Sequence, residues 1–136
     1  MTSPSVEAFL ASLKRCLAVP GFMDDFYRRF VASADEVREK FRDTDMKRQA
    51  QVLADSLYVV ANAVQGEEGS LARRELPRIA ERHSRRDRDI SPALYDLWID
   101  CLVATAQAHD PQFGPEVEHA WRDVLLFGAE YMRQRY

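Results

Sequence analysis

The chain has 136 residues and a formal net charge of -3. This length predicts one domain over residues 1–136, and 46% hydrophobic with 30% charged residues is the balance of a soluble globular protein. The acidic balance argues against general nucleic-acid binding, and no apolar run approaches the roughly 20 residues that span a bilayer. The N-terminal stretch MTSPSVEAFL lacks the basic-then-apolar order of a secretory signal, so we expect a cytoplasmic protein.

The first part of the chain predicts three helices. The five glycines and six prolines of the chain fall mostly between segments of helical periodicity, which favours an all-α fold. A serine followed by a proline begins the first helix at residues 3–4, and Pro20-Gly21 ends it. Apolar residues at steps of three and four predict a second helix over residues 22–31 and a short third helix that ends near Phe41.

Four further helices are expected in the rest of the chain. Capping oxygens at residues 43–45 begin a long helix that runs to about Val64. The loop QGEEGS then leads into a shorter, arginine-rich helix that ends near His83. Serine followed by proline at residues 91–92 repeats the start signal for the sixth helix, and glycine followed by proline at residues 114–115 begins the last one.

Residues of catalytic or metal-binding type are thinly spread. Cys16 and Cys101 lie far apart among apolar helical residues, which predicts buried free thiols rather than a disulfide. The sequence has no cysteine-histidine cluster at zinc spacing, no glycine-rich phosphate loop and no HExxH or GxSxG motif. Adjacent acids such as Asp24-Asp25 are typical of solvated surface charge. The histidines are the remaining candidates for specific chemistry.

The three histidines differ in their surroundings. His109 and His119 lie near expected helix ends and are interpreted as surface residues. His83 follows Ile79 by one turn and Leu76 by two, so its ring projects from an apolar helical face. Such an imidazole can be a metal or cofactor ligand, or it can be a solvent-exposed member of a basic helix end. If it ligates a metal, its other ring nitrogen needs an acceptor, most simply the backbone carbonyl of Ile79.

Three segments carry a pattern that extends beyond single residues. They are FYRRFVASADEVREKF at residues 26–41, DMKRQAQVL at residues 45–53 and LPRIAERH at residues 76–83. With the order and lengths of the helices over essentially the whole chain, they resemble the globin family, in particular bacterial single-domain haemoglobins and the haem domains of flavohaemoglobins. The resemblance implies a globin fold, a 3-on-3 helical sandwich around a pocket for haem b.

On the distal side of the haem, the resemblance implies roles for four residues. Phe41 matches the phenylalanine that stacks against haem, and Tyr27, fourteen positions earlier, matches the tyrosine of the distal pocket. Gln49 takes the distal position, with Leu53 one turn later on the same helical stripe. Gln51 is the competing candidate for the distal position, but it would turn about 200° away from Gln49.

On the proximal side, the resemblance makes His83 the iron ligand, with Ile79 against the porphyrin. Arg85 or Arg86, just past the ligand, is then placed to pair with a haem propionate. Flavohaemoglobins support the proximal histidine with a tyrosine, for which Tyr95 is the candidate, although it lies two residues beyond the spacing of that pattern.

Flavohaemoglobins also support the proximal histidine with a glutamate, and this sequence departs from that pattern. Counting from Trp121 brings the matching position to Tyr136, whereas Glu130 comes too early. We therefore expect weaker electron donation from the proximal histidine, which puts fast oxidative chemistry in doubt.

The segment around His83 is locally basic. Residues 71–90 hold seven arginines against four acidic residues, which gives a local charge of +3 on an acidic chain. These arginines either attract an acidic reductase by electrostatic steering or form an ordinary solvated surface.

The resemblance implies a protein that binds dioxygen, carbon monoxide and nitric oxide. Tyr27 and Gln49 both offer hydrogen-bond donors, so oxygen is expected to be held tightly. Nitric oxide dioxygenase activity is a possible enzymatic role, and since the sequence ends at Tyr136 without a reductase domain, it requires a separate reductase.

Two alternatives stay open: a haem-based gas or redox sensor of globin fold, and a globin fold without haem that serves as a binding surface. The sequence is compatible with a monomer or a homodimer.

Overall fold

The structure is a computed structural model that describes residues 4–66, 71–84 and 90–135. This described part forms α-helices and no strand, which confirms the predicted all-α class. None of its helices is long and apolar enough to cross a membrane. The helices are α1 (Pro4–Leu17), α2 (Phe22–Ser33), α3 (Asp35–Lys40), α4 (Met46–Gln65), α5 (Leu71–His83), α6 (Leu94–His109) and α7 (Pro115–Gln134).

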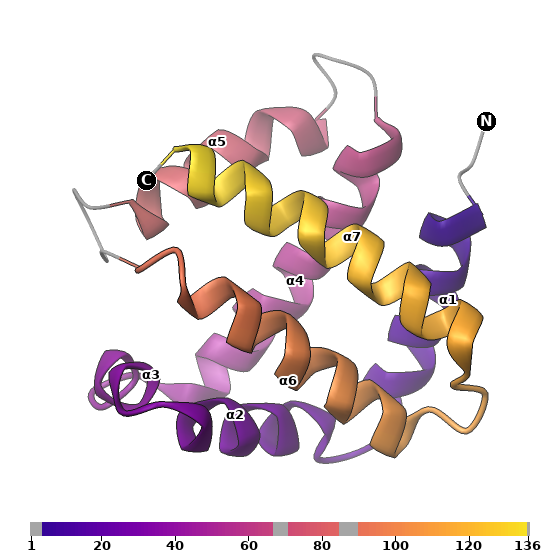
Figure 1. Cartoon of the computed structure of the whole chain (residues 1–136), viewed down its shortest axis with the longest axis horizontal. Coiled ribbons are helices and arrows are strands. Elements are labelled where there is room, and N and C mark those ends of the chain that lie inside the picture. Colours follow the sequence, from indigo (N-terminus) through magenta and orange to yellow (C-terminus); the bar gives the residue numbers. More distant parts are fainter. Residues whose placement is uncertain (1–3, 67–70, 85–89, 136) are drawn as a thin grey trace.

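Helices far apart in the sequence make the largest contacts. α1 packs along α7 and α2 along α6, while α4 packs on α1, α5 and α7. In Figure 1, α6 and α7 run side by side, with α4 behind them. The end of α3, the start of α4, the end of α5 and the start of α6 gather at one end of the molecule, at the left of Figure 1.

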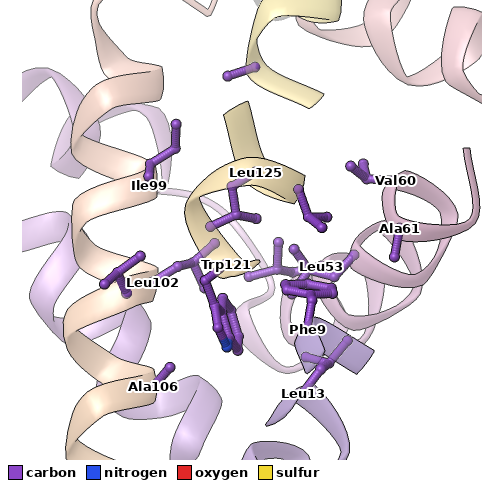
Figure 2. Close-up of a cluster of buried hydrophobic side chains, with 14 of the residues drawn as sticks. Phe9, Leu13, Leu53, Val60, Ala61, Ile99, Leu102, Ala106, Trp121 and Leu125 are labelled. Carbon is purple, nitrogen blue, oxygen red and sulfur yellow. The ribbon is translucent and has the colours of Figure 1, made fainter. Parts of the chain in front are cut away.

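A large part of the core lies between α1, α4, α6 and α7, and buried apolar side chains of α2 and α5 extend it. Phe9 and Trp121 meet edge to face, with ring centroids 4.8 Å apart. Full burial of each large apolar side chain contributes about 1.5–3 kcal/mol, so this cluster stabilises the fold strongly. Figure 2 labels the side chains of this cluster: Phe9, Leu13, Leu53, Val60, Ala61, Ile99, Leu102, Ala106, Trp121 and Leu125.

A glycine allows α7 to approach α4 closely. A Cβ atom at Gly128 would lie 3.1 Å from one methyl group of Val60 and 3.3 Å from the other. Such contacts are tighter than side chains ordinarily make, so a larger residue there requires Val60 to shift by a few tenths of an ångström.

A buried polar network links α1 to the start of the α6–α7 connection. The Trp121 indole Nε1–H donates to Ser12 Oγ at 2.9 Å, and the Ser12 hydroxyl donates to Asp110 at 2.6 Å. Arg15 donates twice to the same carboxylate, at 2.7 and 2.9 Å, and the backbone N–H of Gln112 donates at 2.9 Å. The Asp110 side chain is fully buried, and four donors compensate the loss of its hydration.

The start of α6 differs from the expectation. The backbone N–H of Leu94 donates to the Ser91 carbonyl at 3.0 Å, and that of Tyr95 donates to the Pro92 carbonyl at 3.3 Å. The serine-proline signal therefore marks a turn ahead of α6 rather than its first residues, and the predicted start is wrong. The expected cap of α4 is confirmed, since the Asp45 carboxylate accepts from the backbone N–H of the third residue into the helix.

Both cysteines are free thiols, as predicted. Cys16 is buried, and burial, reinforced by the nearby Asp110 carboxylate, raises its pKa to about 11. Cys101 is half-buried rather than buried, and burial raises its pKa as well. Both thiols therefore stay protonated at neutral pH.

His109 and Asp25 are wrongly predicted as solvated residues. His109 Nε2 lies 2.8 Å from an Asp25 carboxylate oxygen, which joins the end of α6 to α2. The two side chains are only 24% and 12% exposed, and the imidazole meets the ring of Phe22 edge to face. His119, with its side chain 72% exposed, lies at the surface as expected.

The Asp25 contacts predict a pH-dependent contribution to stability. The hydrogen bond from His109 outweighs the opposing effect of burial and, with those from Arg28 and Arg29, lowers the pKa of Asp25 from 3.8 to about 2. Since the folded pKa lies below the unfolded value, the stabilisation is complete above about pH 4 and is lost as the pH falls toward 2. We expect Asp25→Asn to lower the urea midpoint near neutral pH and to approach wild type in acid. Asp24→Asn, at an exposed neighbouring position, is the control. A difference in urea midpoint between Asp25→Asn and wild type that does not shrink in acid would contradict this prediction.

Candidate functional site

His83 is the last residue of α5, and its half-buried imidazole is held by its own helix. Nδ1 lies 2.7 Å from the backbone carbonyl oxygen of Ile79, which is the bond expected from the sequence. Because a carbonyl only accepts hydrogen bonds, Nδ1 carries the proton, and the neutral ring has its lone pair on Nε2. The helix therefore fixes both the tautomer and the direction of the ring.

Tyr95, in the first turn of α6, lies beside this histidine. The ring centroids of Tyr95 and His83 are 6.5 Å apart, with their planes inclined at 39°. The Ile90 backbone N–H donates to the His83 carbonyl at 3.0 Å, so the chain that enters α6 returns to the end of α5. This return brings Tyr95 to His83 despite the longer spacing in the sequence. We call Ile79, His83 and Tyr95 the proximal group.

Tyr27, on α2, is buried against Phe41 at the end of α3. Their ring centroids are 5.5 Å apart, and Tyr27 is only 7% exposed. Burial raises the pKa of Tyr27 to about 12, although a hydrogen bond from the Gln49 side chain opposes this rise. The phenol therefore stays protonated at neutral pH and remains a hydrogen-bond donor.

Gln49 lies on the buried face of α4, and Gln51 does not. The backbone carbonyl of Gln49 accepts from the Tyr27 hydroxyl at 3.4 Å, and its side chain is half-buried one turn before the buried Leu53. Gln51 is exposed, and its amide donates along the helix to Asp55 at 3.0 Å. The helical register thus favours Gln49 over the competing position. The residues of this side are called the distal group: Tyr27, Phe41, Gln49 and Leu53.

The distal and proximal groups lie at neighbouring helix junctions. The distal group spans α2, the end of α3 and the start of α4, and the proximal group spans the end of α5 and the start of α6. Figure 1 shows both junctions at the same end of the molecule. Arg85 and Arg86, the expected partners of a haem propionate, lie outside the described residues.

Comparison with known proteins identifies the family. Residues 24–127 match the globin family. The chain belongs to the globins. A crystal structure from Pseudomonas aeruginosa PAO1, of a protein described as structurally highly homologous to a human hemoglobin, is similar to this globin with a TM-score of 0.91. The two sequences are 36% identical, over 97% of this chain and 98% of that chain. No curated protein matches.

The residues of this globin fit the haem that its family binds. The Ile79 carbonyl holds the proton on Nδ1 of His83, which gives Nε2 the lone pair that an axial iron ligand needs. Ile79 and Phe41, apolar members of the two groups, are half-buried, so a planar apolar cofactor would cover surface that the protein alone leaves open. The predicted globin fold is confirmed, and a haem site is consistent with these donors.

One residue that contacts the proximal group has no clear signal in the sequence. Arg133, on α7, lies with its guanidinium carbon 6.0 Å from the centre of the Tyr95 ring. Glu130, which comes too early to match the supporting glutamate of flavohaemoglobins, accepts from Arg133 at 2.5 Å. The pattern Glu130-x-x-Arg133 shows that these side chains share a helical face, but not which helix they meet.

Proposed function

We propose that this globin binds haem b through His83 and that the bound haem would take dioxygen, carbon monoxide and nitric oxide beside Tyr27 and Gln49. The observation that carries the proposal is the 2.7 Å contact between His83 Nδ1 and the Ile79 carbonyl, which prepares Nε2 as a ligand atom. Bound haem would supply the ferrous iron that binds these gases. The chain itself supplies the axial ligand, hydrogen-bond donors and apolar surroundings.

The Tyr27 hydroxyl is the principal donor proposed for the bound gas. Its hydrogen bond to the Gln49 carbonyl is long, at 3.4 Å, and long hydrogen bonds are weak. A small rotation can therefore direct the hydroxyl to a better acceptor without the loss of a strong bond. Since burial raises the pKa of Tyr27 to about 12, the hydroxyl keeps its proton across the physiological range.

Gln49, Leu53 and Phe41 complete the proposed distal side. The half-buried Gln49 amide is a second donor, and Leu53 and Phe41 give apolar walls that limit the access of water. A polar ligand atom held by fixed donors in apolar surroundings is stabilised more strongly than in water. We therefore propose slow oxygen release.

Haemin titration tests the proposal. The absorbance change on addition of haemin to the haem-free protein is expected to saturate at one haem per chain. Uptake without saturation would mean nonspecific association, and it would contradict a defined site at His83.

Substitution of Tyr27 with phenylalanine is expected to speed oxygen dissociation. The change removes one buried donor, worth about 1–3 kcal/mol, which corresponds to a rate increase of roughly 5- to 150-fold. Stopped-flow displacement of oxygen by carbon monoxide measures the rate. Tyr58→Phe is the control, because Tyr58 lies at the exposed surface of α4 and is 37% exposed. An unchanged rate in Tyr27→Phe would contradict the proposed role of the hydroxyl.

Nitric oxide dioxygenation is a further activity that we propose for the same distal group. One dioxygen, one nitric oxide and one electron give one nitrate, so each turnover needs an electron from a reductant. The donors of Tyr27 and Gln49 would hold dioxygen while nitric oxide enters. Nitrate formation in the presence of an external reductant, lost in His83→Gly, tests this activity.

A further inference from the structure

Arg133 joins three parts of the chain near the end of α7. One terminal nitrogen donates to Asp96 in the first turn of α6 and the other donates to Glu130 on α7, both at 2.5 Å. Nε donates to the backbone carbonyl of Pro92 at 3.4 Å. The Arg133 side chain is 23% exposed, so these contacts hold it in a largely enclosed position. Its planar guanidinium can make all three contacts at once.

The same contacts fix Tyr95. The Pro92 carbonyl that accepts from Arg133 also accepts from the backbone N–H of Tyr95, at 3.3 Å. The guanidinium carbon of Arg133 lies 6.0 Å from the centre of the Tyr95 ring, within the range of a cation–π contact. Tyr95 is thus tied to α7 through both its backbone and its ring.

From Tyr95 the contacts lead to His83. The Tyr95 and His83 rings lie 6.5 Å apart, and the Ile90 N–H binds the His83 carbonyl. Both contacts with His83 come from residues 90–95, the segment that the Arg133 side chain links to α7. Movement of this segment would change what packs beside the His83 imidazole.

We propose that Arg133 is a positioning residue for the proximal histidine, acting through Tyr95 and the segment of residues 90–95. The inference rests on the proposed function, because it requires His83 to be the ligand of the haem iron. Residues that orient a metal ligand without touching the metal strongly affect its affinity. Removal of the arginine should therefore loosen residues 90–95 and weaken the retention of haem.

The chain offers a matched control in Arg122. Its guanidinium also bridges α7 to α6, donating to Asp100 at 3.0 Å and to Glu118 at 3.1 Å. Arg122 lies eleven residues, about three turns, before Arg133 on α7. Arg122→Met thus removes a similar ion-pair bridge far from Tyr95.

Hydrogen exchange of the full chain, with and without haemin, tests the first half of the inference. In Arg133→Met, the backbone amides of Ile90, Leu94 and Tyr95 are expected to exchange on the order of ten-fold faster, because charged hydrogen bonds are lost. Arg122→Met should leave these amides at wild-type rates. Equal acceleration in the two variants, or none in Arg133→Met, would overturn the inference.

The transfer of haemin to excess apomyoglobin tests the second half. Arg133→Met is expected to lose haemin roughly ten-fold faster than wild type, and Arg133→Lys, which keeps the charge without the planar fork, at an intermediate rate. The iron–histidine vibration should shift in Arg133→Met and not in Arg122→Met. Wild-type rates and an unshifted vibration in Arg133→Met would overturn the inference. Failure of the proposed function looks different: the wild type itself would take up no haemin.

Discussion

Replacement of His83 by glycine is expected to abolish stable haem retention. The substitution removes the axial nitrogen and leaves a space about the size of an imidazole. Residues that only support a metal ligand change affinity by about 10- to 100-fold, so loss of the ligand itself should weaken haem binding by more than about 100-fold. Haemin titration followed by absorbance measures the loss. Added imidazole should restore binding, because it can occupy the vacated space and supply the missing nitrogen.

His119→Gln is the control for this experiment. The His119 side chain is 72% exposed and contacts Asp123 on its own helix, so its loss should leave haem binding unchanged. If the His83→Gly variant keeps haem without added imidazole, and its ferrous spectrum is unchanged, another residue ligates the iron.

The largest effect on stability is expected for Asp110→Ala. Although burial opposes ionisation, the hydrogen bonds from Arg15, Ser12 and Gln112 lower the pKa of Asp110, so the carboxylate is charged at neutral pH. Its removal leaves the buried Ser12 hydroxyl and the partly enclosed guanidinium of Arg15 without this acceptor. Breaking such a pair costs about 3 kcal/mol or more, and we expect a loss of about 3 kcal/mol in the free energy of unfolding. Urea denaturation measures this loss.

Asp123→Ala provides the comparison for Asp110→Ala. Asp123 also contacts two side chains, since it accepts from Ser5 and lies 3.1 Å from His119 Nε2, but its side chain is 49% exposed. Exposed contacts of this kind contribute within about 0.5 kcal/mol, because water replaces the lost partners. Equal losses in the two variants would contradict the role of burial in the Asp110 network.

Local features of the site could be predicted from the sequence. The His83–Ile79 contact spans one helical turn. It can therefore be predicted from the spacing of the two residues and from the bounds of α5. The choice of Gln49 over Gln51 follows from the register of α4, because Leu53 and Leu57 identify its buried face. In both cases one helix determines the outcome.

Contacts between distant segments could not be predicted in this way. Arg133 and Tyr95, or His109 and Asp25, are joined by the packing of different helices, which a single sequence does not specify. Helical periodicity reports which face of a helix is buried but not which helix covers it. For the same reason, Asp25 resembles an ordinary surface acid in the sequence, although His109 lies beside it in the structure.

The absorption spectrum of the protein, purified from cells supplied with a haem precursor, tests the central claim most directly. Spectra are recorded in the ferric, dithionite-reduced and carbon-monoxide-bound forms. We predict a Soret band that shifts on reduction and shifts again with carbon monoxide. A colourless protein that takes up no added haemin would contradict haem binding through His83, although the globin fold itself would remain.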